Sequence, residues 1–142
     1  MRLTINLPEL FPFVFNVPVR ITDINYGNHT GNHAMVSIIH ESRMQWLMFN
    51  HFTELNIDGV GLIMADLAIQ FKNESFYGDV ISVQLGVGDI TLTGFELFYQ
   101  LTATRGDKQI LIAKAKTGMV CFDYTNKRIV AIPEVLKKLI GG

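Results

Sequence analysis

The hydrophobic period of the chain is that of a helix from residue 32 to residue 49 and that of strands after it. Over residues 32–49 apolar side chains recur at every third or fourth position, which predicts a helix with a broad apolar stripe. The flanks of that stripe are also apolar, so we expect burial on more than one side. Beyond it, apolar and polar residues alternate over residues 63–71, 81–87, 95–101 and 109–122, a pattern typical of strands with one core-facing side.

Shorter predicted elements surround these. Pro12 and Pro18 flank an apolar strand over residues 13–17 and place it at the edge of a sheet. The links between consecutive strands are short, as between antiparallel neighbours. The sequence therefore predicts an α+β fold in which an antiparallel sheet covers one long helix. The remaining predicted features are a hairpin turn over residues 104–108, a bulge or bend at Gly118, a short strand over residues 128–132 and a terminal helix from Pro133.

Length, charge and cysteine content narrow the class of protein. At 142 residues the chain suits a single domain, 1–142, that can bury its own core. Its 12 Lys and Arg residues against 13 Asp and Glu residues leave a net charge of −1, which gives no electrostatic reason to bind nucleic acid. Neither a membrane helix nor a secretory signal is recognisable, and the one cysteine, Cys121, lies in an apolar run typical of a buried thiol. We expect a cytoplasmic protein with no nucleic-acid or membrane partner.

Polar and turn-forming residues gather just before the predicted helix. Between Arg20 and Asn32, Gly, Asn and Asp occupy nearly every second position, which favours turns, and Asn32 is the expected N-cap. A Gly-rich turn that opens a helix supplies unpaired backbone N–H groups and the positive end of the helix dipole. Such groups can stabilise an oxyanion.

This segment and the helix after it resemble the hot-dog acyl-CoA thioesterases, in the branch of 4-hydroxybenzoyl-CoA thioesterase. Proteins of that branch carry a strand ending in Arg-x-x-Asp-x-Asp, then Gly-His-x-x-Asn, then a helix with Glu-x-Arg. The residues that match without a gap are Arg20, Asp23, His29, Asn32, Glu41 and Arg43. The strand order also agrees, so the resemblance covers about the whole chain. It implies a hot-dog fold and hydrolysis of an acyl thioester to free acid and CoA thiol, without a cofactor.

Two positions depart from the pattern of that branch. Asn25 stands where the branch carries the Asp that serves as nucleophile or general base, and an amide cannot take a proton from water at neutral pH. Asn28 stands in place of the Gly before the His, with Gly27 displaced by one residue. The first departure favours an alternative function, a non-hydrolytic module that binds an acyl thioester.

Thioester hydrolysis needs a base or an attacking carboxylate, and donors for the oxyanion. The base is expected to be Glu41, ahead of Asp23 and His29, because burial in an apolar helix would make its carboxylate a stronger base. Asn25 would orient the attacking water, and the amides near Gly27 and Asn28 would receive the oxyanion. The residues expected to bind the substrate are Tyr26, Gly27, Asn28, Asn32 and Asp66.

The candidate bases also have structural interpretations. Glu41 fits a buried polar anchor, Asp23 a side chain that holds the turn, and His29 a structural imidazole. Arg43 cannot be the partner of Glu41, because residues two apart do not face each other on a helix. His29 and His33 are four residues apart, but His29 lies before the helix, so no metal site is expected.

The resemblance also implies how the chain assembles and what it acts on. The substrate would be an acyl-CoA or an acyl carrier protein thioester, and the protein a homodimer or a tetramer of dimers with sites shared between subunits. The second face of the strand over residues 62–72 carries Leu62, Met64 and Ala68, which is more apolar than an exposed face should be. We therefore expect this strand at a subunit boundary.

Overall fold

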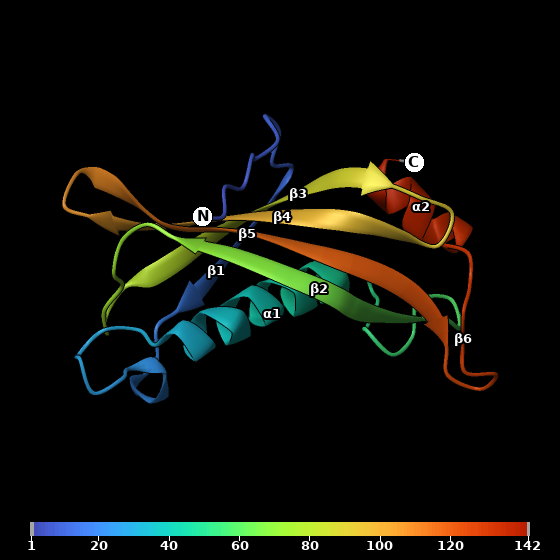
Figure 1. Ribbon diagram of the computed structural model, residues 1–142, viewed down its shortest axis with the longest axis horizontal. Coiled ribbons are helices and arrows are strands. Elements are labelled where there is room, and N and C mark those ends of the chain that lie inside the picture. Colours follow the sequence, from blue (N-terminus) through green and yellow to red (C-terminus); the bar gives the residue numbers. More distant parts are fainter. Residues whose placement is uncertain (1, 142) are drawn as a thin grey trace.

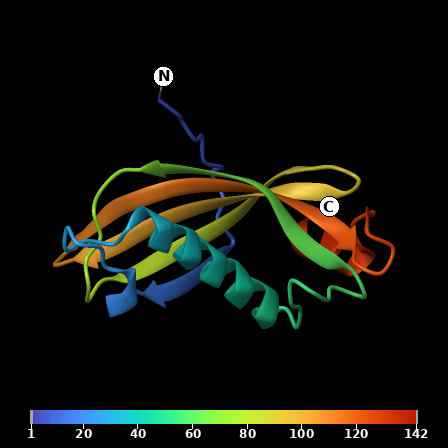
Figure 2. The same ribbon diagram turned by 60° about the horizontal axis from the view of Figure 1, so that its bottom comes forward.

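A computed structural model describes residues 2–141 as one antiparallel sheet that curves along one long helix (Figure 1). The sheet has six strands in the order β1-β3-β4-β5-β2, with β6 paired to β5. The helix α1 lies along one face of this sheet, and α2 lies at the end where β3 ends (Figures 1 and 2). This is the α+β hot-dog arrangement expected from the sequence. The elements in chain order are β1 (Phe13–Pro18), the 3-10 helix η1 (Ile21–Asp23), α1 (Asn32–Phe49), β2 (Gly61–Phe71), β3 (Val80–Ile90), β4 (Gly94–Arg105), β5 (Lys108–Asp123), β6 (Arg128–Ile129) and α2 (Glu134–Ile140).

The core lies between α1 and the sheet, as the two hydrophobic periods require. Met35, Ile38 and Trp46 of α1 are almost fully buried, as are Leu85 and Leu97 on the facing strands. Burial of each large apolar side chain stabilises the fold by about 1.5–3 kcal/mol. The predicted central helix, the edge position of β1 and the hairpin turn between β4 and β5 are all confirmed. The strand predicted over residues 128–132 is shorter, because pairing with β5 extends only over Arg128–Ile129.

The N-cap of α1 is Gly31, so the prediction of Asn32 as N-cap is wrong by one residue. Gly31 has an extended backbone, and its carbonyl accepts hydrogen bonds from the amides of Ala34 and Met35. Asn32 is therefore the first helical residue. No side chain caps this end of the helix.

The bulge predicted at Gly118 lies instead in the strand opposite, at Ala65. The pairing of β2 with β5 shifts between Met64 and Asp66, which leaves Ala65 as the extra residue. The amide of Gly118 donates to Asp66 Oδ1 (2.9 Å), and a Cβ at residue 118 would lie 2.6 Å from that oxygen. The close approach of this carboxylate explains the glycine.

This bulge reverses the faces of β2 on its N-terminal side. Leu62 pairs with Cys121 and Met64 with Met119, two buried residues of β5, so Leu62 and Met64 lie on the helix-facing side of the sheet. The prediction that Ile63 faces the core, and that Leu62 and Met64 form the second face, is therefore wrong. Beyond the bulge, the prediction of which side chains face the core is correct, since Ile69 pairs with the buried Ala115 and packs against the core.

Two further expectations concern membranes and the thiol. Among the described residues no helix is both long and apolar enough to cross a membrane. Cys121 is fully buried, and burial raises the pKa of its thiol to about 11. The prediction of a buried thiol is confirmed.

Candidate functional site

The polar segment before α1 folds into a tight loop that Asn25 organises. Asn25 Oδ1 accepts hydrogen bonds from the amides of Gly27 (2.9 Å) and His29 (3.4 Å). The backbone of Asn25 also pairs with the His29 carbonyl (2.9 Å) and with the Asn28 amide (3.1 Å), and Asn28 adopts a left-handed φ of 66°. The amides of Gly27 and Asn28 thus already have acceptors. These contacts count against the prediction that the amides near Gly27 and Asn28 receive the oxyanion.

Asp23 holds the start of this loop. Its side chain is 4% exposed and accepts hydrogen bonds from the Arg20 amide (2.8 Å) and the Arg20 guanidinium (3.2 Å). Its carbonyl accepts from the Gly31 amide (2.9 Å), which ties η1 to the start of α1. These contacts agree with the structural interpretation of Asp23.

The N-terminus of α1 opens into a small cavity, which we call the His29 cavity. It measures about 200 Å³ and is lined by His29, Asn32, Met35 and the segment that follows β2. The amides of Asn32 and His33 have no acceptor within the helix, since they belong to its first turn, and no side chain caps them. This end of α1, where Asn32 lines the cavity, therefore has free donors and positive potential.

His29 is held at the edge of this cavity by its own loop and by the segment after β2. Its Nδ1 lies 3.2 Å from the Thr30 carbonyl, and its Nε2 lies 3.8 Å from Glu74 Oε1. Thr30 is in turn bonded to Ser75, through its amide to the Ser75 carbonyl (2.8 Å) and between the two hydroxyls (2.7 Å). If Nδ1 donates to the Thr30 carbonyl, Nε2 carries the lone pair on the side of Glu74.

Arg105 fixes the segment that lines the His29 cavity. Its Nη2 donates to the Glu74 carbonyl (2.7 Å) and to Asp79 Oδ2 (2.8 Å), and its guanidinium lies 5.0 Å from the centre of the Phe76 ring. Burial tends to raise the pKa of Asp79, but the contacts with Arg105 and the Phe76 amide outweigh it, so the pKa is lowered. The wall of the cavity is therefore anchored by an ionised pair.

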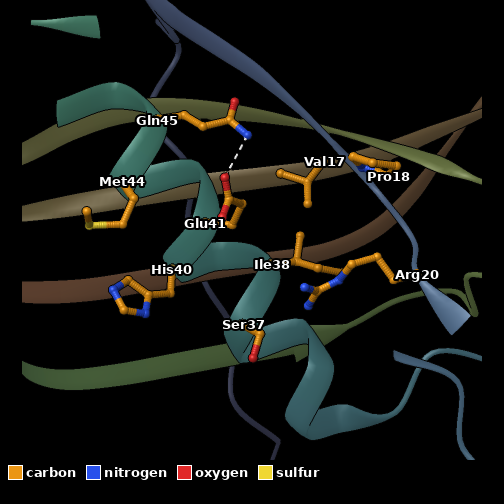
Figure 3. A pocket seen from close by; sticks show the side chains of 9 residues that line it. All are labelled: Val17, Pro18, Arg20, Ser37, Ile38, His40, Glu41, Met44 and Gln45. Carbon is orange, nitrogen blue, oxygen red and sulfur yellow. Dashed lines mark hydrogen bonds between the residues drawn. The ribbon is translucent and has the colours of Figure 1, made fainter. Parts of the chain in front are cut away.

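Glu41 lies in a different place, in a groove of about 430 Å³ between α1 and β1 (Figure 3). Arg20, His40 and Gln45 also line this groove, and Gln45 Nε2 donates to Glu41 Oε2 (3.0 Å). Glu41 is exposed, so the expectation that burial strengthens it as a base is wrong. The groove shares no lining residue with the His29 cavity.

A chain of polar side chains that the sequence did not predict runs from α1 into the core. Glu54 binds His40 Nε2 through Oε1 (2.5 Å) and Arg43 Nε through Oε2 (3.0 Å). Arg43 Nη1 donates to the Tyr99 hydroxyl (3.2 Å), which pairs with the Thr117 hydroxyl (2.8 Å). Burial alone would lower the pKa of Arg43, but its contacts with Tyr99 and Glu54 outweigh burial and raise the pKa above its usual value.

This polar chain borders the largest of the cavities described, which we call the Glu54 cavity. Its volume is about 590 Å³, and His40, Arg43 and Glu54 line it together with Leu62 and Met64 of β2. The sequence indicated that Arg43 does not pair with Glu41, which is confirmed by its pairing with Glu54. Nothing in the sequence pattern marks Glu54 as its partner.

The remaining predicted residues lie apart from the His29 cavity. Tyr26 is fully exposed. Asp66 lies on the outer face of the sheet, opposite α1, where its carboxylate caps the Gly118 amide. Of the predicted residues, the structure thus brings together His29 and Asn32, next to the loop of Asn25, Gly27 and Asn28. Among residues 2–141 no three His, Cys, Asp or Glu side chains are placed to hold a metal ion.

Several proteins with a similar sequence or structure are named as thioesterases or CoA hydrolases. Over 82 residues the chain is 33% identical to a 1,4-dihydroxy-2-naphthoyl-CoA hydrolase from Microcystis aeruginosa, a match that covers 58% of this chain and 56% of that protein. The chain thus matches only about half the length of this curated relative.

The structural likeness extends over nearly the whole fold. A 1,4-dihydroxy-2-naphthoyl-CoA thioesterase from Synechocystis has a TM-score of 0.80 at 20% identity, covering 91% of this chain and 95% of its own. A gentisyl-coenzyme A thioesterase has a TM-score of 0.77 at 15% identity, covering 90% and 99%. At these identities the likeness supports the hot-dog fold. Residues 19–140 match the family model of the thioesterase-like superfamily. This range includes both the loop before α1 and the whole sheet beyond β1, so the chain belongs to this superfamily.

Proposed function

We propose that the chain hydrolyses an acyl-CoA thioester to a free acid and CoA thiol. The observation that carries the proposal is the His29 cavity, where the first-turn amides of α1 have no acceptor in the helix. Donors placed there can stabilise the oxyanion that forms when water attacks the thioester carbonyl. The water oxygen bonds to the carbonyl carbon, the carbon–sulfur bond breaks, and the proton lost by water goes to the thiolate. Membership of the thioesterase-like superfamily supports the same reaction.

A screen of acyl-CoA thioesters tests this function. Thiol release would be followed with aliphatic chains of several lengths and with hydroxylated aromatic acyl groups, since relatives are named for 1,4-dihydroxy-2-naphthoyl-CoA and gentisyl-CoA. The same acyl groups on an acyl carrier protein would identify the carrier. We expect turnover with at least one class, and no thiol release across the whole set would refute the proposal.

One observation favours the alternative of a non-hydrolytic acyl-thioester binding module. Asn25 stands where the 4-hydroxybenzoyl-CoA thioesterase branch carries an Asp, and its Oδ1 accepts hydrogen bonds from two backbone amides of its own loop. Mixing the protein with acyl-CoA distinguishes the two functions. Binding with the thioester intact would favour the module, and release of thiol would favour the hydrolase.

We also propose that this single domain, 1–142, works as a cytoplasmic homodimer, or a tetramer of dimers, joined along β2. β2 is an edge strand of 11 residues, and within residues 2–141 it pairs with β5 alone. An edge of this length offers a row of backbone donors and acceptors to a second copy. Of the apolar residues predicted at this boundary, Ala68 remains on the outer face. Sedimentation at micromolar concentration should give at least twice the mass of one chain, and a monomer would refute the interface.

Exchange of Glu41 for glutamine tests the base that the sequence favours. Because Glu41 is exposed and lies outside the His29 cavity, we expect Glu41→Gln to lower turnover by less than about tenfold, with an unchanged melting temperature. Steady-state kinetics with thiol detection measures the effect. A loss of about 10²–10⁴-fold with the fold intact would instead identify Glu41 as the base.

A further inference from the structure

The polar chain from Thr117 to His40 is costly for a small core. Arg43 is 4% exposed and Tyr99 fully buried, so their polar groups have been removed from water. Replacing such buried ionic groups by apolar ones is often neutral or stabilising, so their presence here calls for a reason other than stability. Strained or costly arrangements of charge are frequent at functional sites. The last member of this row of polar side chains is His40, whose side chain is 53% exposed to solvent.

His40 and Glu54 form a pair in which the carboxylate orients the imidazole. Glu54 is fixed on its other oxygen by Arg43, which is itself held by Tyr99. With Nε2 donating to Glu54, the lone pair of His40 lies on Nδ1. In Figure 3 the ring points away from Arg20, on the side of α1 away from β1. A carboxylate behind an imidazole favours the imidazolium that forms when the imidazole takes a proton.

We propose that His40, oriented by Glu54, is the base that activates water, and that it acts on a thioester held in the His29 cavity of a second copy. This inference rests on the proposed function and names a base for it. Nδ1 takes a proton from water as the water oxygen attacks the carbonyl carbon. When the carbon–sulfur bond breaks, that proton passes from Nδ1 to the thiolate sulfur.

A second copy is required because the two half-sites are far apart in one chain. His40 lies eight positions beyond Asn32 in α1, which corresponds to about 12 Å along the helix axis. A base must come within about 3 Å of the proton that it takes, directly or through one water. One chain therefore cannot apply both its own free amides and its own His40 to the same carbonyl.

The two cavities lie at opposite ends of β2. Phe71, at the C-terminal end of β2, lines the His29 cavity, whereas Leu62 and Met64 near the N-terminal end line the Glu54 cavity. A twofold axis through the middle of β2 pairs the strand with its copy in antiparallel orientation. The end of one strand then lies beside the start of the other. The His29 cavity of each copy is thereby brought next to the Glu54 cavity of its partner.

The first experiment replaces His40 in the full-length protein. His40→Gln keeps hydrogen-bonding capacity but is a far weaker base, and we expect kcat to fall by about 10²–10⁴-fold with little change in KM. His51→Asn is a matched control, because His51 is also exposed, lies outside both cavities and has a positive φ that Asn tolerates. Added imidazole should restore part of the activity of His40→Ala, which a purely structural role would not allow. Wild-type-like turnover in His40→Gln would overturn the inference.

The second experiment mixes two inactive variants. Asn32→Pro removes the first free amide of α1, and His40→Gln removes the proposed base. Random mixing gives mixed dimers in about half of the population, each with one complete site, so about a quarter of wild-type activity should return. Two half-sites within one chain would give no recovery, which would overturn the proposal. If the wild-type protein releases no thiol from any substrate, the proposed function itself fails, an outcome distinct from both.

Discussion

Asn32→Pro is expected to lower turnover by about 10²–10³-fold while the protein stays folded. Removal of one oxyanion donor costs about this much in enzymes of acyl transfer. Proline is well tolerated at the first position of a helix, because the amide that it lacks has no partner there. Gly31, the residue before it, has an extended backbone (φ −70°, ψ 155°), as a residue before proline requires. The variant therefore removes a donor without disturbing α1.

The control for this variant keeps the amide and removes only the side chain. Asn32→Ala should retain turnover within about tenfold if the backbone N–H is the active group. Circular dichroism and the melting temperature of both variants would establish that α1 is intact. Equal losses in Asn32→Pro and Asn32→Ala would move the role from the backbone amide to the side chain.

The long helix and the four long strands could be predicted from the sequence, because each has a regular repeat of apolar residues. A helix that packs on a sheet must repeat its apolar residues every three or four positions, and a strand with one core face must alternate them. β2 shows the limit of this reasoning. The extra residue at Ala65 shifts the phase by one, so Ile63 turns outward and Leu62 inward. The alternation of apolar and polar residues does not mark the bulge, which lies next to the contact of the Asp66 carboxylate with the Gly118 amide across the sheet.

The site was only partly predictable for a related reason. His29 and Asn32 meet at one cavity because the loop and the helix start are neighbours in sequence. The contacts of Arg43 are non-local, since Glu54 lies 11 residues away and Tyr99 56 residues away. A spacing rule on one helix can exclude Glu41 as a partner, but it cannot find a carboxylate on a later loop. Only the fold brings Glu54 between His40 and Arg43.

Arg43→Met is expected to reduce the free energy of unfolding by about 3–5 kcal/mol, the usual cost of removing one partner of a buried ion pair. The methionine fills much of the arginine stem, so the loss reports the charge and not a cavity. It leaves Glu54 with one partner fewer and removes the guanidinium that donates to the buried Tyr99 hydroxyl. Since Glu54 keeps 20% of its side chain exposed, the lower end of the range is expected. Chemical denaturation with urea measures the change.

Two comparisons separate this effect from that of an ordinary ion pair. Lys116→Met breaks the ion pair of Lys116 with Glu96 (3.1 Å), in which the two side chains are 39% and 29% exposed. It should lower the free energy of unfolding by less than about 1 kcal/mol. The double variant Arg43→Met, Glu54→Leu removes both charges and should recover at least about half of the loss, because no carboxylate is then left behind. If the buried polar side chains serve function, the double variant is more stable than Arg43→Met but has no higher turnover. The reason is that His40 has lost the carboxylate that orients it. Recovery of both would show that the polar chain serves the fold alone.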